Sequence, residues 1–396
     1  MPVRFLQLHT LTSYPTSLLN RDDAGFAKRM PFGGAVRTRI SSQCLKRHWR
    51  VYEGDNSLSE IEAPQSVRSR ISFERYVVDP LVKDGIPQAQ ARAAAQAVAG
   101  YLLGSEQKKS KAKKTGGKKD VSESGAQEEP VTTAQVTVLG RPELEYLSTM
   151  VRTTVKETKG DLGKIETAIA TKLKDKKLKE NLAALQPGSL EAGLGAALFG
   201  RMVTGDILAR TDAAIHVAHA LTVHGQMTES DYFSAIDDLL REDGEQGSGH
   251  INASELTSGL FYGYVVVDVD GLIENLGGNN ALAGDVVSRL AHIIATVSPG
   301  AKKGSTAPYA YSHLVLAEGG QAQPRTLQNA FLEPVRQAGN VVENAYRALQ
   351  GHLADLDDMY GKREARAHAG LQSKEFFETR MPVADLATWL KDQITT

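Results

Sequence analysis

The sequence predicts an α+β fold in which a core of strands is interrupted by a long, mainly helical insertion. Strand patterns lie near both ends of the chain, at residues 3–11, 261–270 and 311–317. Between residues 67 and 185 the apolar side chains instead recur at helical spacing. The 396 residues suffice for roughly two to three domains, or for one core with large insertions. Strands at both ends around a helical middle favour the second arrangement.

The first strand, residues 3–11, alternates apolar and polar side chains after Phe5. Residues 13–37 follow without a sustained period and are predicted to form a long irregular loop, a kind of segment that is usually functional. Ser41 or Ser42 is a suitable N-cap for a helix that runs through Trp49. The insertion is predicted to contain four further helices, at residues 67–82, 87–103, 142–158 and 161–185.

The second half of the chain returns to strand and helix patterns that belong to the core. Residues 261–270 are β-branched and aromatic and form the clearest strand of the sequence. The remaining core elements are predicted as a helix at 281–297, a strand at 311–317 and helices at 340–360 and 383–394. Residues 105–130 carry a run of lysines followed by glutamates with almost no apolar side chains, so we expect a disordered surface loop there.

Several classes of protein are disfavoured by what the sequence lacks. A single cysteine, Cys44, cannot form an intramolecular disulfide, and the N-terminus has no apolar signal-peptide core, so a cytoplasmic location is expected. No run of 18 apolar residues predicts a membrane span. Neither a GxxxxGK[ST] loop nor a GxGxxG fingerprint occurs, and no cofactor is expected.

Positive charge is concentrated between residues 21 and 50, where eight Lys and Arg side chains face only Asp22 and Asp23. The same stretch contains a Phe-Gly-Gly turn and the serine-capped helix start. Glycines that permit close approach, free helix N–H groups and basic side chains are the devices that bind phosphate. The residues therefore predict a cradle for an anion or a nucleic acid, with a solvated basic face as the alternative.

One short segment contains four candidate metal ligands: Asp212, His216, His219 and His224. Their neighbours are mostly apolar, which favours histidines that form hydrogen bonds inside a packed element. A metal-dependent hydrolase remains a minor alternative. No other acid/base pair has a diagnostic spacing, and no metal is expected.

Ordered sequence motifs give a family resemblance. Leu-Asn-Arg-Asp-Asp at residues 19–23, Phe-Gly-Gly at 32–34 and Arg-Ile-Ser-Ser-Gln-x-Leu-Lys-Arg at 39–47 resemble the CasC family. CasC is the repeated backbone subunit of Cascade, the type I-E CRISPR surveillance complex. Later motifs agree in order, among them Gly-Arg-Met at 200–202 and Glu-Asn-Leu-Gly-Gly at 274–278. The resemblance covers most of the chain.

The resemblance implies a right-hand-shaped protein with a modified ferredoxin-like palm of the RNA-recognition type. The palm corresponds to residues 1–57 and 258–396, helical fingers to 58–190, and a thumb to 203–257. It also implies a non-enzymatic subunit that polymerises along the CRISPR RNA spacer, kinks it periodically and presents its bases to target DNA. The implied partners are CRISPR RNA, the target DNA strand, further copies of the chain and the other Cascade subunits.

The family's RNA contacts map onto nine positions of this sequence: Arg21, Lys28, Gln43, Lys46, Arg47, Arg50, Met202, Tyr232 and Phe233. Two departures are visible. Ala35 and Val36 stand where relatives continue with basic residues, and Tyr232 stands where a tryptophan is more usual. Tyrosine keeps a stacking face of smaller area.

A nuclease is the main alternative, because related backbone subunits of other CRISPR effector types cut bound target RNA with an acidic loop residue. Asp22 and Asp23 lie in a comparable loop of this sequence. Their position beside Arg21 also suits a role in orienting the loop, so the resemblance favours a subunit without catalytic residues.

Overall fold

The computed structural model describes residues 3–102, 129–188, 190–202, 208, 210–236, 248–372, 376–377 and 379–395. The chain divides into two compact units. The larger contains Met1–Ile61, Ile215–Leu272 and Asn279–Thr396, and the smaller contains Glu62–Ala214 and Ile273–Gly278. The palm, fingers and thumb boundaries given above stay predictions. Residues 105–128 of the lysine-rich segment and residues 203–207, 209 and 237–247 of the predicted thumb lie outside the described residues.

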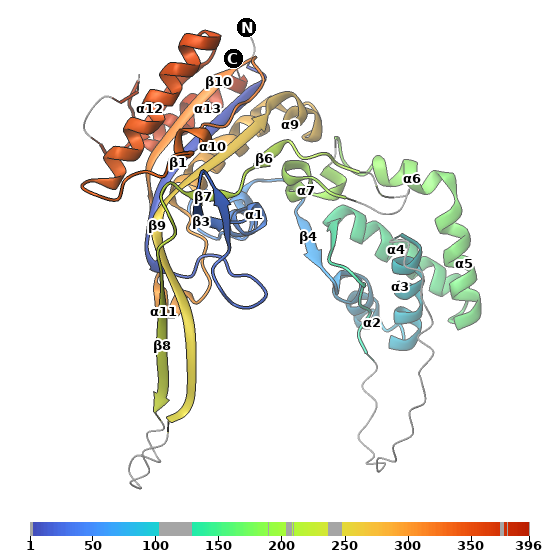
Figure 1. The fold of residues 1–396 in the computed structure, drawn as a ribbon. Helices are drawn as coiled ribbons and strands as arrows, with labels where there is room; N and C mark the ends of the chain where they lie inside the picture. The colour runs from blue at the N-terminus through green and yellow to red at the C-terminus, as the bar shows by residue number, and fades with distance from the viewer. Residues whose placement is uncertain are drawn as a thin grey trace. The chain divides into compact units, whose positions relative to one another are not determined.

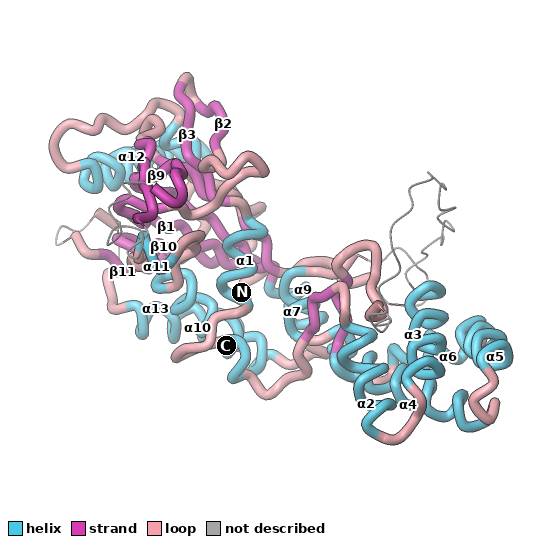
Figure 2. The backbone as a smooth tube through the Cα atoms, turned by 90° about the horizontal axis from the view of Figure 1, so that it is seen from below, coloured by secondary structure: helices cyan, strands magenta, loops and turns pink. Residues whose placement is uncertain are grey.

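The larger unit is built on an antiparallel sheet in which the N-terminal strand lies between two strands from the second half of the chain (Figures 1 and 2). β1 (Phe5–Ser17) pairs with β9 (Ser248–Asp268) on one side and with β10 (Ser312–Gly320) on the other. The strand order is β11-β10-β1-β9-β7-β3-β2, with β6 and β8 paired to β9. The remaining strands of this sheet are β2 (Arg29–Phe32), β3 (Ala35–Ile40), β6 (Ile215–Val217), β7 (Ala220–Thr222), β8 (Thr228–Ile236) and β11 (Ala365–Gly370).

Helices cover both faces of this sheet (Figures 1 and 2). α12 (Val341–Tyr360) packs on the face that carries Leu11, Leu314 and Leu316. α10 (Asn280–Thr296) and α13 (Val383–Thr395) pack against each other and against β10. The boundary between the two units falls within α9 (Val269–Asn275), after Leu272. The smaller elements of the larger unit are α1 (Ser42–Arg50), η1 (Leu58–Glu60), α11 (Lys303–Thr306) and η4 (Gln328–Phe331). The predicted helices at 281–297, 340–360 and 383–394 and the strand at 311–317 are therefore confirmed.

The prediction of one irregular loop over residues 13–37 is wrong. β1 continues to Ser17, and β2 and β3 form a hairpin within the remainder. Threonine, serine and proline at the end of β1 concealed the strand, because its pairing with β9 rather than its own composition holds it extended. The helix that follows begins as predicted, with Ser41 as the N-cap of α1.

β8 and the first part of β9 form a hairpin that extends beyond the sheet (Figure 1). β9 is longer than the predicted strand, because it begins at Ser248 and its register with β8 runs from Ser248 to Thr257. It then enters the sheet beside β1, where Leu260, Tyr262 and Val267 are buried. One strand thus links the sheet to the projecting hairpin.

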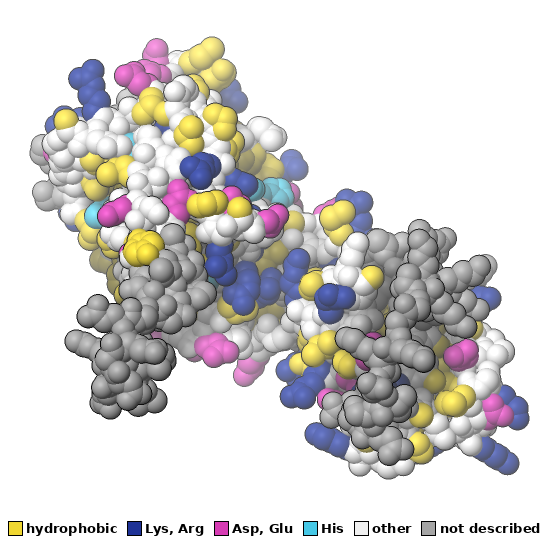
Figure 3. Space-filling model, turned by 60° about the horizontal axis from the view of Figure 1, so that its bottom comes forward, with side chains coloured by type: hydrophobic (Ala, Val, Ile, Leu, Met, Phe, Trp, Pro, Cys, Tyr) yellow, Lys and Arg dark blue, Asp and Glu magenta, His cyan; other side chains and the backbone are white. Residues whose placement is uncertain are grey.

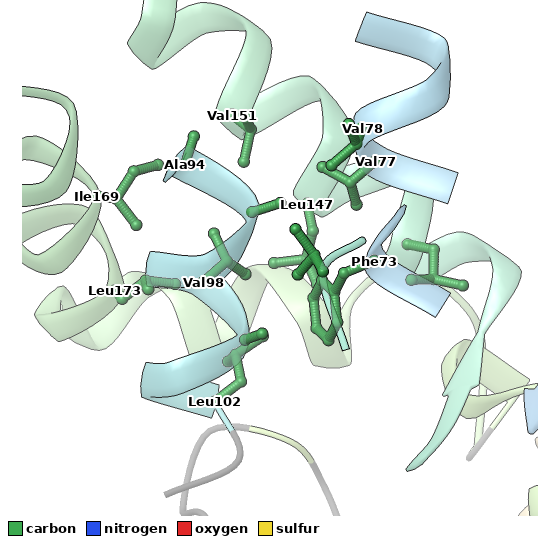
Figure 4. Close-up of a cluster of buried hydrophobic side chains, with 14 of the residues drawn as sticks. Phe73, Val77, Val78, Ala94, Val98, Leu102, Leu147, Val151, Ile169 and Leu173 are labelled. Carbon is green, nitrogen blue, oxygen red and sulfur yellow. The ribbon is translucent and has the colours of Figure 1, made fainter. Parts of the chain in front are cut away.

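The smaller unit is mainly helical around its own apolar core (Figure 4). In the close-up Phe73, Val98, Leu147 and Ile169 point toward one another from different segments. Its helices are η2 (Glu74–Val78, a π-helix), α2 (Asp79–Lys83), α3 (Gln88–Leu102), α4 (Arg141–Glu157), α5 (Leu162–Lys174), α6 (Lys176–Ala183), η3 (Leu190–Ala192) and α7 (Leu194–Phe199), and β4 (Ser66–Ser69) pairs with β5 (Thr137–Gly140).

Two helix predictions in the smaller unit need correction. The segment 67–82 begins as strand β4 and becomes helical only from η2 onward. The segment 161–185 is two helices, because Asp175 has extended backbone and accepts a hydrogen bond from the Lys177 N–H as the N-cap of α6. The predictions for 87–103 and 142–158 are confirmed by α3 and α4. Among the described residues, none of the helices combines the length and apolar character needed to cross a bilayer.

Candidate nucleic-acid interface

α1 buries one face and presents a polar, basic face on the opposite side. Leu45 and Trp49 are its buried residues. Positions three, four and seven residues apart share one side of a helix, and here that side carries Gln43, Lys46, Arg47 and Arg50. Gln43 and Arg47 are exposed, while the other two are half-buried. The helix contains no acidic residue, so the positive charge is not neutralised within it.

The segment Leu19–Lys28 is connected to the start of α1 by hydrogen bonds. Asn20 Oδ1 accepts the Ser41 N–H at 2.9 Å, and Ser41 Oγ in turn accepts the Cys44 N–H at 3.3 Å. The Lys28 N–H donates to the Asn20 carbonyl at 2.9 Å. These bonds hold the backbone of Lys28 beside the N-terminal end of the basic helix.

The charges of Lys28 and Arg47 both act on the thiol of Cys44. Burial raises the pKa of Cys44, and the positive charges of Arg47 and Lys28 oppose that rise. Among the ion pairs within the described residues, none involves Arg21, Lys28 or Arg47, whereas Arg29 faces Glu255 at 3.8 Å. In Figure 3 dark-blue Lys and Arg side chains lie at several places on the face shown, among magenta Asp and Glu side chains. Of the basic residues in the first fifty positions, Lys28 thus lies beside the basic face of α1 that carries Lys46, Arg47 and Arg50.

Asp22 organises the loop that carries Arg21. Its Oδ1 accepts the N–H groups of Ala24 and Phe26, each at 3.0 Å, and its own N–H donates to the Phe26 carbonyl at 2.8 Å. Arg21 forms a β-bridge with Ala27, and its side chain is exposed. Asp22 thus stabilises the turn after Arg21. This agrees with the predicted role of the aspartates in orienting the loop.

The Phe-Gly-Gly turn serves the fold rather than an approaching ligand. Gly33 has φ +60°, and a Cβ there would lie 1.6 Å from the Leu332 carbonyl oxygen. Arg37, which the charge count included, is fully buried and donates to the carbonyls of Phe32, Thr222 and Phe331. Both features tie the β2–β3 hairpin to its own unit, so the close approach expected at this turn is to the chain itself.

Two basic positions beside this surface, Arg39 and Lys303, are not among the nine mapped RNA contacts. Arg39 Nη1 donates to His219 Nδ1 at 2.7 Å. The pKa of His219 is lowered by burial first and then by the charges of Arg39 and Lys28. Arg39 pairs with Leu221 across β3 and β7, so it is the sheet that brings this arginine beside His219.

Lys303 is the second of these positions. Burial lowers the pKa of His48 on α1, and Lys303 and Arg47 lower it further, while hydrogen bonds to the Cys44 and Gly300 backbone oppose them. Lys303 follows α10 and is far along the chain from the basic stretch of residues 21–50. Only the tertiary fold brings this lysine near the helix.

The three remaining predicted contacts lie elsewhere. Tyr232 is in β8 and is 66% exposed. Phe233 follows it in β8, opposite Asn252, and its side chain lies outside the described residues. Met202 belongs to the smaller unit and is 98% exposed, more than any other large apolar side chain described.

The candidate metal ligands do not form a site in the described part of the chain. No group of three or more His, Cys, Asp or Glu side chains in those residues is arranged to hold a metal ion. His224 is buried, and its Nε2 accepts the Leu260 N–H at 3.1 Å. Asp212 is paired with Arg210 at 3.1 Å. His216 and His219 are exposed on and beside β6, so the prediction of packed histidines holds only for His224.

Residues 6–394 match the profile of the CT1975-like protein family. The chain therefore belongs to this family. A solved chain described as "CRISPR RNA-guided surveillance complex, pre-nicking" matches this CT1975-like chain with a TM-score of 0.75 and 25% identity, covering 98% of this chain and 100% of that one. A second, described as "CRISPR RNA-guided surveillance complex", has a TM-score of 0.63 and 21% identity, covers 97% of this chain and 99% of that one, and supports the fold alone. No curated protein matches.

These matches confirm the family resemblance drawn from the sequence. For the CT1975-like chain the fold is thus a mixed α/β architecture with a large antiparallel sheet and many helices, similar to subunits of CRISPR surveillance complexes. The first of these structures, at 25% identity, is described as part of an RNA-guided surveillance complex.

Proposed function

We propose that this chain is the RNA-binding backbone subunit of a type I-E Cascade complex, a scaffold without catalytic residues of its own. Copies of the chain line the CRISPR RNA spacer in the cytoplasm, divide it into short segments and leave its bases available to the target DNA strand. The sheet around β1 and β9 acts as a modified ferredoxin-like palm. The smaller unit supplies the fingers, and the β8–β9 hairpin belongs to the thumb.

The observation that carries this proposal is the outward face of α1. It offers three cationic side chains and one amide on a helix that has no acidic residue, and the rigid Asn20–Ser41 connection holds Lys28 beside it. Such a surface binds phosphates rather than base edges, so it accepts any spacer sequence. A subunit that holds every guide in the same way needs that property.

The structural role of Asp22 in its loop argues against the nuclease alternative. Its Oδ1 accepts two backbone N–H groups in the loop, so one of its two carboxylate oxygens serves to hold the turn. A catalytic carboxylate for metal-assisted cleavage needs to be available to the metal ion. Incubation of the assembled complex with labelled complementary RNA and Mg²⁺ tests this point: we expect no cleavage, and regular cuts lost in Asp23→Ala would replace the scaffold by a nuclease.

The central test is the double variant Lys46→Ala/Arg47→Ala. Each lost phosphate contact reduces the slope of log affinity against log salt by about 0.7 for a single strand, so we expect a reduction of about 1.4, equal for spacers of different sequence. Arg347→Ala is the matched control, because Arg347 is an exposed arginine on α12 paired with Glu343. An unchanged slope, or a loss restricted to one spacer, would contradict the proposed function.

A further inference from the structure

Glu255 is a nearly buried acidic residue of β9, two positions before Thr257, where the strand joins β1 in the sheet. Its side chain is 11% exposed. Its Oε2 accepts the Ala27 N–H at 3.0 Å and lies 3.8 Å from Nη2 of Arg29. One carboxylate of the β8–β9 hairpin therefore contacts the residues on both sides of Lys28.

The backbone of Lys28 itself is held by two further hydrogen bonds. Its N–H donates to the Asn20 carbonyl at 2.9 Å, and its carbonyl accepts the Arg39 N–H at 2.8 Å. The second bond continues the ladder between β2 and β3, so the chain is extended at this point. Successive side chains of an extended segment point to opposite sides. Because Arg29 faces Glu255, Lys28 points away from that carboxylate.

The charge of Lys28 acts on the basic surface of α1. It opposes the rise in the pKa of Cys44 in α1, and it lowers the pKa of His219 beside β6. The ammonium group and the carboxylate thus serve different surroundings. Lys28 belongs to the basic surface, and the group that holds its neighbours belongs to the hairpin.

A carboxylate close to a phosphate-binding surface is electrostatically unfavourable for binding, because phosphate and carboxylate repel each other. Its structural contribution is specific. Ala27 is 2% exposed, and a buried N–H that loses its acceptor is costly. Without the Glu255 acceptor, the segment would rearrange to find another partner for the Ala27 N–H, and Lys28 would move with it.

We propose that Glu255 is a positioning residue of the RNA interface. It ties the segment that carries Lys28 to the hairpin and thereby places the Lys28 ammonium beside α1, where it contacts an RNA phosphate. This inference rests on the proposed function. Glu255 acts through Lys28 and does not touch the RNA, so its role depends on an acceptor at the right distance and not on its negative charge.

Two variants separate the reach of the Glu255 side chain from its charge, with the purified full-length chain and a fluorescently labelled single-stranded RNA. Glu255→Asp keeps the charge but shortens the side chain. We expect the slope of log affinity against log salt to fall by about 0.7, the value of one phosphate contact, with an affinity loss of about fivefold at 0.1 M salt. Glu255→Gln keeps the length and an acceptor oxygen, so its slope should stay native. Glu229→Asp, at an exposed glutamate of β8, is the control.

Simple charge repulsion predicts the opposite pattern. If Glu255 acts only as a negative charge near the RNA, Glu255→Gln strengthens binding and Glu255→Asp leaves it unchanged. The route through Lys28 is tested by combining variants. Lys28→Ala alone should lower the slope by about 0.7, and adding Glu255→Asp should lower it no further. The slope compares one preparation at several salt concentrations, so it does not depend on the fraction of chain that is folded.

The proposal is overturned if Glu255→Asp or Lys28→Ala keeps the native slope, or if Glu255→Gln loses as much as Glu255→Asp. It is also overturned if Glu255→Asp lowers the slope equally with and without Lys28. In any of these cases a reduced slope for Lys46→Ala/Arg47→Ala leaves the proposed function standing. If that double variant keeps the native slope, the proposed function itself fails.

Discussion

β3 and α1 follow one another in the chain and both carry arginine, yet they use its charge in opposite ways. Arg37 in β3 is fully buried and donates to three backbone carbonyls that come from different segments of the larger unit. Arg47 in α1 is exposed and has no ion-pair partner among the described residues. A count of charges cannot separate these cases. What separates them is whether the chain itself supplies acceptors.

The same contrast recurs for other residue types. Tyr262 is buried and its hydroxyl accepts the Leu327 N–H, whereas Tyr232 is exposed on the projecting hairpin. Buried His224 accepts a hydrogen bond from the backbone N–H of Leu260, whereas exposed His219 accepts one from the side chain of Arg39. Side chains whose hydrogen-bond partners are buried groups of the same chain stabilise the fold, and exposed polar or aromatic side chains are the candidates for binding RNA.

The largest effect is expected from Arg37→Met, which keeps an apolar stem but removes the donors. Leaving buried carbonyls without their donor costs about 3 kcal/mol or more in the free energy of unfolding, or roughly 6–12 °C in Tm. Thermal melts of RNA-free protein measure it. Arg47→Ala in parallel should leave Tm nearly unchanged. Equal melting temperatures for both variants would show that the two arginines do not differ as described.

Tyr232→Ala is expected to have the reverse profile. Stacking of a base on an aromatic side chain contributes about 1–3 kcal/mol by alanine substitution, so RNA affinity should fall by about five- to 150-fold with little change in Tm. Tyr360→Ala, which removes an exposed tyrosine of α12, is the control. Phe233→Ala should behave like Tyr232→Ala. Destabilised variants that retain RNA normally would instead assign both residues to the packed interior.

The limits of sequence reasoning follow the same division. The N-cap at Ser41 and the basic face of α1 could be predicted because both depend on residues close in sequence. The burial of Arg37 could not, because its acceptors at Thr222 and Phe331 lie far along the chain. β4 and the end of β1 were missed for that reason too, since partner strands rather than local composition hold them extended.

The two histidines predict opposite responses to acid. His219 has a lowered pKa in the free protein because of burial, Arg39 and Lys28. A bound phosphate would raise that pKa, so binding takes up a proton and RNA affinity increases, by up to tenfold per pH unit for one proton, as pH falls toward the lowered value. His219→Gln should abolish this dependence, measured as affinity between pH 5.5 and 8. An unaltered pH profile in the variant would remove His219 from the interface.

For His224, acidification should instead lower the stability of the folded protein. Its pKa is lowered by burial, and protonation at Nε2 would break the bond from the Leu260 N–H. The unfolded chain therefore binds a proton more readily, so this stabilisation is present above about pH 6.5 and is lost as pH falls through the lowered pKa. Urea unfolding of His224→Gln against the native chain should show a smaller loss on acidification. A loss of the same size in both would assign the acid sensitivity to other groups.

The smallest effect is expected at Glu191, which is buried near the Arg201–Glu143 pair but has an Oε2 atom without a hydrogen-bond partner in the described residues. Burial raises its pKa, and Glu143 adds to the rise more than Arg201 opposes it. The folded chain thus binds the proton more tightly than the unfolded chain, so stability is present below about pH 4.5 and decreases as pH rises through the raised pKa. Glu191→Gln removes the ionisation and should stabilise the protein at neutral pH by about 1 kcal/mol or less, with no gain near pH 4. Glu143→Gln is the matched control of opposite sign, because it takes a charged partner from a buried arginine. If Glu191→Gln destabilises at every pH, the carboxylate of Glu191 is a paired group like Glu143, and the distinction between filled and open bonding capacity fails at this position.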